Sequence, residues 1–269
     1  MLRKVIDSNQ LRDENLRVYL QASSQNFAVL PDYVAMEAYK GNALVTITES
    51  MEILSQYPRQ VIILKGTREV SLLSGRAAGL QKRMIDGRQT CGFEAYTRLL
   101  STAKQGDLNV QGQILDHGKA AAEHMERMLK TAAEITEVIG PLVQEYSREH
   151  RAEIRTWRIT SQEVVSKIVN AVIMISAEVF RMLPHRPKLP SMKELPNTFV
   201  FRAVLCTYLM VIERGSTGGG ASVKKVRNDV VDMYVSAYST FFDGVLSKDA
   251  KLIRIQYHAQ MILKEIFLR

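Results

Sequence analysis

Acidic residues in two distant parts of the chain have the types and spacing to do chemistry. Asp7 and Asp249 each follow a short apolar segment, and Glu37 follows another one. Asp229 and Asp232 are three residues apart and would share one face of a helix. Carboxylates gathered at one place repel one another, and a hard divalent cation offsets that cost. A fold that brings such residues together would suit a Mg²⁺ or Mn²⁺ site for phosphodiester hydrolysis.

Taken one at a time, these acidic residues have simpler explanations. Asp7 could cap the helix that follows it, and this would be the better explanation if Asp7 stood by itself. Glu37 alone would be a solvated helix residue, and Asp243 could begin a turn. The joint pattern favours a shared site, because each residue lies at the end of an expected strand or on an adjoining helix.

The first part of the chain alternates expected strands and helices. This alternation is typical of a parallel sheet flanked by helices. Ligands bind at the carboxyl ends of such strands, where Asp7 and Asp249 are expected to lie. The apolar runs predict strands at 3–8, 27–30, 61–64 and, near the C-terminus, 242–246, and helices at 11–21, 33–39 and 46–54.

Helical spacing dominates the middle of the chain, where we expect no strand. We predict an α/β fold of three layers (α/β/α), with a central, mostly parallel sheet and a large helical insertion. The predicted divisions are the N-terminal half of the core at 1–70, the insertion at 71–214 and the C-terminal half of the core at 215–269. The expected helices span 93–103, 108–139, 142–155, 161–183, 198–213 and 253–267, with a proline-punctuated connection at 184–190.

The composition points to a basic protein with an ordinary core. The formal net charge of the 269 residues is +8. This charge favours a polyanionic partner such as nucleic acid. A surface that is merely rich in Lys and Arg explains it equally well. Cys91 and Cys206 form no CxxC pair, and the five histidines show no metal-ligand spacing, so we expect no zinc site and no disulfide. The start of the chain shows no signal peptide, and no apolar run approaches the roughly 20 residues that span a bilayer. We therefore expect a soluble cytoplasmic protein with no membrane partner.

Four short motifs resemble, in this order, the successive motifs of PIN-domain nucleases. They are Val-Ile-Asp-Ser-Asn at 5–9, Leu-Pro-Asp-Tyr-Val-Ala-Met-Glu at 30–37, Asn-Asp-Val-Val-Asp at 228–232 and Val-Leu-Ser-Lys-Asp at 245–249. Each motif is short, and the ordered set carries the resemblance. It covers the two ends of the chain and not the helical middle, and family members are often much shorter. The resemblance implies a PIN-like, Rossmann-like core.

The resemblance also implies a function, namely a metal-dependent endoribonuclease that hydrolyses RNA phosphodiester bonds with Mg²⁺ or Mn²⁺. Asp7, Glu37 and Asp229 would be the acidic residues of the metal site, and Asp249 would be the fourth catalytic acidic residue. Asp232 is a second candidate in the third motif, either as a metal ligand or as the partner of one. Residues that would support the site through hydrogen bonds or local structure are Ser8, Asn9, Asn228, Asp243 and Ser247.

Positive charge lies just before the third motif. A glycine-rich loop at 215–220 is followed by Lys224, Lys225 and Arg227, which could contact the phosphate backbone of RNA or of DNA. A mobile surface loop explains the same residues equally well, and the loop lacks the pattern of a P-loop.

Two other classes of protein fit parts of the pattern. One is a catalytically weak PIN-like scaffold that binds RNA or protein through its helical insertion. For the nuclease and the scaffold alike, a homo-oligomer or a regulatory protein partner is a further possibility. Tyr146 and Trp157 in that insertion could stack on bases, although a place in the helical core explains them better. The other is a phosphatase of the haloacid-dehalogenase type, which needs a second aspartate at the position where this chain has Asn9.

Overall fold

The computed structural model describes residues 1–158, 161–183, 188–217 and 222–267. Within these ranges the protein is an α/β protein with a parallel sheet and mostly helices, so the predicted class is confirmed. The chain forms two compact units. The sheet unit contains Met1–Val70, Gly79–Arg127 and Phe241–Ala250, and the helical unit contains Ser71–Ala78, Met128–Thr240 and the residues from Lys251 onward. These units group the chain differently from the predicted divisions 1–70, 71–214 and 215–269.

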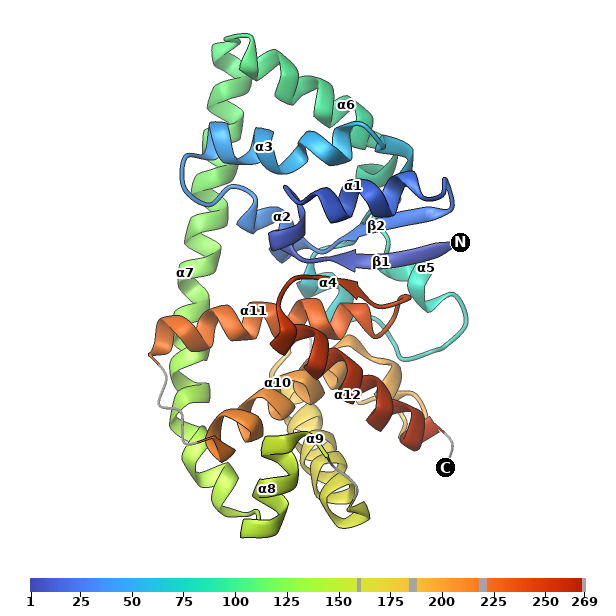
Figure 1. Cartoon of the computed structure of the whole chain (residues 1–269), viewed down its shortest axis with the longest axis vertical. Coiled ribbons are helices and arrows are strands. Elements are labelled where there is room, and N and C mark those ends of the chain that lie inside the picture. Colours follow the sequence, from blue (N-terminus) through green and yellow to red (C-terminus); the bar gives the residue numbers. More distant parts are fainter. Residues whose placement is uncertain (159–160, 184–187, 218–221, 268–269) are drawn as a thin grey trace. The chain divides into compact units, whose positions relative to one another are not determined.

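The sheet unit is built on four parallel strands in the order β3-β2-β1-β4 (Figure 1). Val5 is in register with Val29 on one side and with Val245 on the other, and Val5 and Val29 are fully buried. Because the strands are parallel, their carboxyl ends lie at one edge of the sheet. The strands are β1 (Leu2–Ile6), β2 (Asn26–Leu30), β3 (Val61–Ile63) and β4 (Val245–Leu246).

The strand predicted at 242–246 is wrong in its first part. Only Val245 and Leu246 pair with β1, because the preceding residues form a turn that ends at Gly244. Gly244 has φ +105°, a conformation that other residues rarely adopt. The strands predicted at 3–8, 27–30 and 61–64 are confirmed, with ends that shift by one or two residues.

Helices of the sheet unit pack on the strands and on one another. Helix α1 contacts β2 and α3, and α6 contacts β3 and α3 (Figure 1). A Cβ atom at Gly118 would lie only 2.7 Å from the Cβ of Ala43, so the close approach of α7 to α3 requires glycine. Two short helices, α4 and α5, are absent from the sequence prediction. The elements are η1 (Ser8–Gln10), α1 (Glu14–Gln21), α2 (Asp32–Glu37), α3 (Ala43–Ser55), η2 (Pro58–Gln60), α4 (Thr67–Ser71), α5 (Leu80–Met84) and α6 (Gly87–Lys104).

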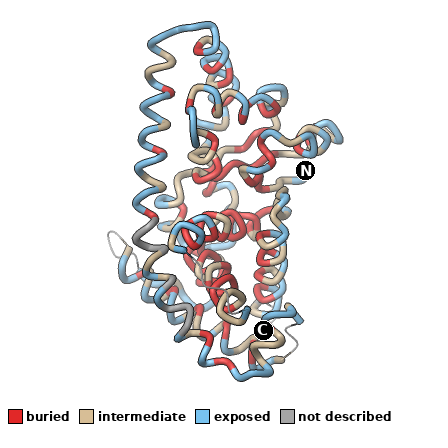
Figure 2. The backbone as a smooth tube through the Cα atoms, turned by 60° about the vertical axis from the view of Figure 1, so that its left-hand side comes forward, coloured by how far each residue is buried: buried red, intermediate tan, exposed pale blue. Residues whose placement is uncertain are grey.

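The helical unit is organised around α10, most of which is buried. This helix contacts α8, α9 and α11. Figure 2 shows buried residues along α10 and α11 and a largely exposed α7. The elements are α7 (Leu108–Gln144), which contributes to both units, α8 (Arg148–Thr156), α9 (Gln162–Met182), η3 (Leu195–Asn197), α10 (Phe199–Ser216), α11 (Val223–Ser239) and α12 (Ala250–Phe267).

The long helix α7 corrects a predicted boundary. We expected one helix to end at residue 139 and another to begin at 142, but α7 continues through Pro141 to Gln144. Pro141 is exposed, so the backbone carbonyl that loses its usual N–H partner there can be solvated. Among the described helices, none is both long and apolar enough to cross a membrane. The predicted connection at 184–187 and residues 218–220 of the glycine-rich loop lie outside the described residues.

Candidate functional site

The pairing of β1 with β4 brings two of the predicted site residues side by side. The Asp7 backbone N–H donates to the Leu246 carbonyl at 3.0 Å, which extends the strand pairing by one residue. The Ser247 hydroxyl then donates to Oδ2 of Asp7 at 2.5 Å. Residues far apart in the sequence therefore meet at the carboxyl edge of the sheet because two neighbouring parallel strands end there.

A second hydroxyl connects this edge to α2. The Ser8 hydroxyl donates to Oε2 of Glu37 at 2.6 Å, and Glu37 is the last residue of α2. Each of the two adjacent residues Asp7 and Ser8 thus contacts a different partner segment. The expected role of Ser8 and Ser247, hydrogen bonding to a carboxylate of the site, agrees with these contacts.

Asn9 fixes the turn that follows β4. Its amide donates to the Ser247 hydroxyl at 3.3 Å, and its carbonyl oxygen accepts from the Lys248 backbone N–H at 3.1 Å. The Asp249 backbone N–H donates to the Ser247 hydroxyl at 2.9 Å. Asn9 and Ser247 together hold the start of this turn, and with it Asp249, next to the end of β1.

Asp7 is a buried carboxylate next to other carboxylates. Only 4% of the residue is exposed. Burial raises the pKa of Asp7, the hydrogen bonds from Ser247 and from the Ser8 backbone lower it, and the negative charges of Glu37 and Asp249 raise it further. The net effect is a raised pKa, so ionising Asp7 in the folded protein costs free energy that a nearby cation would offset.

The side chains of these carboxylates are not arranged as a complete set of metal ligands in this structure. In the part of the chain that the structure describes, no three His, Cys, Asp or Glu side chains are grouped so that they could hold one metal ion. The donor chemistry fits a hard cation, because carboxylate oxygens are the ligands that Mg²⁺ and Mn²⁺ prefer. Glu37 and Asp249 are near enough for their negative charges to contribute to the raised pKa of Asp7, after the larger contribution of burial.

Three other aspartates of the sheet unit have structural partners. Asp243 accepts from the Arg3 backbone N–H at 2.7 Å, in agreement with a structural role, and so fixes the approach to β4. Asp32 accepts from the backbone N–H of Thr67 at 2.6 Å and from its hydroxyl at 2.7 Å. Asp13 caps α1 and forms an ion pair with Lys248. The contacts of Asp32 and Asp13 connect segments that follow the strands at the carboxyl edge, whereas Asp243 precedes β4 and therefore lies at the opposite end of β1 and β4.

Asp229 belongs to the helical unit and has a different environment. It lies on α11, is 8% exposed, and its Oδ1 is 2.9 Å from the ammonium group of Lys251 on α12. Its Oδ2 pairs with the guanidinium group of Arg214 on α10. The predicted role of Asp229 as a metal ligand stays a prediction, and in this structure two cations neutralise its carboxylate.

Arg214 and Lys251 are not among the residues predicted from the sequence. They lie on helices other than that of Asp229, so no spacing within one motif identifies them. Asp232, on the same helix as Asp229, is half-buried, and the Asn228 side chain is exposed and accepts from the Arg227 guanidinium at 3.0 Å.

The three cations predicted to bind nucleic acid differ in their exposure. Lys224 and Lys225 are exposed at the start of α11, where a phosphate could reach them. Arg227 is only 6% exposed, so its guanidinium group lies mostly inside the helical unit. Tyr146 and Trp157 also pack within this unit, as favoured from the sequence. Tyr146 is buried with its hydroxyl 2.9 Å from that of Tyr208, and Trp157 stacks on His258 at 4.4 Å between ring centres.

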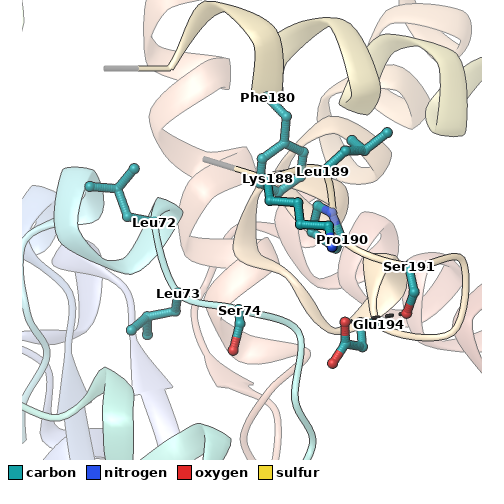
Figure 3. Close-up of a pocket in the computed structure, with 9 residues that line it drawn as sticks. All are labelled: Leu72, Leu73, Ser74, Phe180, Lys188, Leu189, Pro190, Ser191 and Glu194. Carbon is teal, nitrogen blue, oxygen red and sulfur yellow. Dashed lines mark hydrogen bonds between the residues drawn. The ribbon is translucent and has the colours of Figure 1, made fainter. Parts of the chain in front are cut away.

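A pocket of about 480 Å³ lies in the helical unit. Figure 3 shows the side chains of Leu72, Phe180, Leu189 and Pro190 around it. Glu194 also lines the pocket and accepts a hydrogen bond from Ser191 at 3.2 Å. The lining is mainly apolar, and none of the acidic residues predicted for the site contributes to it.

Comparison of the chain with protein-family models, with curated proteins and with solved structures gave no match.

Proposed function

We propose that the protein is a metal-dependent endoribonuclease that acts through carboxylates at the carboxyl edge of its parallel sheet. The observation that supports this most strongly is Asp7, which is buried and accepts a hydrogen bond from Ser247, and whose pKa is raised by burial and to a lesser extent by the charges of Glu37 and Asp249. A buried carboxyl group whose pKa is shifted by burial and by nearby charges is typical of functional sites. The PIN-like form of the fold, with three layers and a large helical insertion, is part of the same proposal.

The roles of the residues follow from their contacts. Asp7, Glu37 and Asp249 would hold a Mg²⁺ or Mn²⁺ ion, which when bound supplies activation of water and stabilisation of charge on the phosphate. Ser247 and Ser8 orient Asp7 and Glu37 through their hydroxyl groups. This orientation is important for metal binding, because Mg²⁺ demands a near-ideal arrangement of its oxygen ligands.

Asp229 and Asp232 remain further candidates for the acidic set. To bind a metal ion, Asp229 would have to exchange Arg214 and Lys251 for that ion. The proposed metal site therefore consists first of Asp7, Glu37 and Asp249. Asp229 has the weakest support as a metal ligand, because two cations already neutralise its carboxylate.

The substrate is proposed to be RNA, and DNA would undergo the same chemistry. The net charge of +8 is consistent with a polyanionic substrate. The protein is also proposed to act in the cytoplasm. It is proposed to associate with a second copy of itself or with a regulatory protein.

Cleavage of labelled single-stranded RNA by the purified protein tests this function. The wild type should cleave with Mn²⁺ or Mg²⁺ and stop when EDTA is added, and Asp7→Asn should not cleave. Glu52→Gln is the matched control, because Glu52 is an exposed carboxylate on α3 of the same unit. Circular dichroism establishes that both variants are folded. Cleavage by Asp7→Asn at the wild-type rate would refute the assignment.

The ion pairs of Asp229 favour a second candidate, a scaffold that binds RNA or protein without cleaving it. A PIN-like core whose third-motif aspartate is bound to Arg214 and Lys251 would be catalytically weak. RNA binding by the wild type, together with no cleavage at any tested concentration of Mn²⁺ or Mg²⁺, would select this candidate.

A further inference from the structure

We propose that the arginine face formed by Arg148, Arg151 and Arg155 of α8, together with Arg158 just after the helix, binds the phosphodiester backbone of single-stranded RNA. This inference concerns a surface of the helical unit that is separate from the predicted cations Lys224, Lys225 and Arg227. It rests on the proposed function only for the choice of RNA as the polyanion.

The arrangement of these arginines is set by the helix. Arg148, Arg151 and Arg155 follow one another at spacings of three and four residues, which places them on one side of α8. Arg158 follows just after the end of the helix. Arg148, Arg155 and Arg158 are exposed, and Arg151 is half-buried. From Arg148 to Arg155 the helix rises by roughly 10 Å.

The acidic residues of α8 have hydrogen-bond partners within the protein. The pKa of Glu149 is held below its ordinary value by a hydrogen bond to its own backbone amide and by the Ser147 hydroxyl, with smaller contributions from the charges of His150 and Arg151. Glu153 accepts from the Ser161 backbone N–H at 3.1 Å. Within the described residues, none of the four arginines forms an ion pair, whereas Arg98 and Arg181 on other helices pair with Glu94 and Glu178. The charges of the exposed Arg148, Arg155 and Arg158 are therefore available to an external anion.

The chemistry of the face favours nucleic acid over a membrane surface. Ile154, the one large aliphatic side chain of α8, is fully buried in the helical unit. A helix that binds a bilayer needs an exposed apolar side to insert, and α8 lacks one. Guanidinium groups bind phosphate oxygens through paired hydrogen bonds, which suits a row of backbone phosphates.

Binding of a fluorescently labelled single-stranded RNA, measured by anisotropy in EDTA over a series of salt concentrations, tests this surface. The variant combines Arg148→Gln, Arg155→Gln and Arg158→Gln. The control combines Arg59→Gln, Arg68→Gln and Arg88→Gln, which removes the same charge from exposed arginines on three separate elements of the sheet unit. We expect the α8 variant to bind about tenfold more weakly or worse near 0.1 M salt, and its log–log salt slope to fall by about 2. The control should retain the wild-type slope.

Three results would overturn the inference. The α8 variant could bind as well as the wild type, or both variants could lose the same affinity, which would show an effect of net charge alone. In the third result, the α8 variant no longer binds vesicles of phosphatidylcholine and phosphatidylserine, while its RNA binding is unchanged. Because EDTA prevents metal-dependent cleavage, RNA binding through α8 can succeed while the nuclease proposal fails, and the two failures are distinguishable.

Discussion

Asp7 in the sheet unit and Asp229 in the helical unit are both buried aspartates, yet their surroundings are opposite. Asp7 is next to two hydroxyl-bearing residues and within reach of the charges of Glu37 and Asp249. Asp229 lies between Arg214 and Lys251, and each of its oxygens has a cation. Both residues belong to motifs of the same resemblance, so the motifs alone do not distinguish them.

The difference teaches that the partners of a buried carboxylate decide what it contributes. A carboxylate paired with cations is part of the fold, and the fold becomes less stable when it is removed. A carboxylate beside other carboxylates costs free energy in the folded state, and such a cost is typical of sites that bind a cation or react. On this basis Asp7 is the functional candidate, and Asp229 is needed first for stability.

The largest expected effect on stability is that of Asp229→Ala. The substitution leaves Arg214 and Lys251 without their common anion, and we expect the free energy of unfolding to fall by about 3–5 kcal/mol. Urea denaturation of both proteins measures this. Glu178→Ala is the control, because it breaks the exposed ion pair with Arg181 in the same unit and should cost less than about 1 kcal/mol. A loss for Asp229→Ala no larger than that of the control would contradict the account.

A smaller loss is expected for Ser247→Ala. The Ser247 hydroxyl donates to the Asp7 carboxylate and accepts from the Asp249 backbone N–H, so both groups lose a partner. We expect a destabilisation of about 2 kcal/mol, because the lost hydrogen bond has a charged acceptor. Ser55→Ala, at an exposed position on α3, should change stability by less than about 0.5 kcal/mol. Equal stability of the two variants would show that the Ser247 contacts are unimportant for Asp7.

The smallest effect, and one of opposite sign, is expected for Asp7→Asn in EDTA. The folded-state pKa of Asp7 is raised above 3.8, so its ionised form destabilises the folded protein at neutral pH. As the pH falls through the raised pKa toward 3.8, Asp7 becomes protonated and this destabilisation of the folded protein disappears. The melting temperature of Asp7→Asn should therefore exceed that of the wild type at pH 7, and the difference should shrink as the pH is lowered. If Asp7→Asn is less stable than the wild type at pH 7, the ionised Asp7 carboxylate does not destabilise the folded protein.

Much of the sheet could be predicted because its strands are apolar runs bounded by turn residues. The β1–β2–β3 part was found in this way, and the position of Asp7 at the carboxyl edge followed from it. Helices α4 and α5 have five residues each, too few to show a helical period. The predicted helices at 108–139 and 142–155 do not include Pro141, but α7 continues through this exposed proline to Gln144.

The candidate site was predictable only in part, for a reason that Asp229 illustrates. The meeting of Asp7 with Ser247 follows from two neighbouring parallel strands, which a pattern of apolar runs can indicate. The pairing of Asp229 with Arg214 and Lys251 depends on how three helices pack. Helical periodicity shows which side of a helix is buried, but it does not show which charged residue of another helix will lie opposite.

The most direct test of the central claim is the binding of Mn²⁺, followed by the loss of the free-ion signal in electron paramagnetic resonance. The account predicts a saturable site in the wild type and in Glu52→Gln, and a dissociation constant raised by about tenfold or more in Asp7→Asn. Equal Mn²⁺ binding by Asp7→Asn and the wild type, or no saturable binding by the wild type, would contradict the claim that Asp7, Glu37 and Asp249 form a metal site.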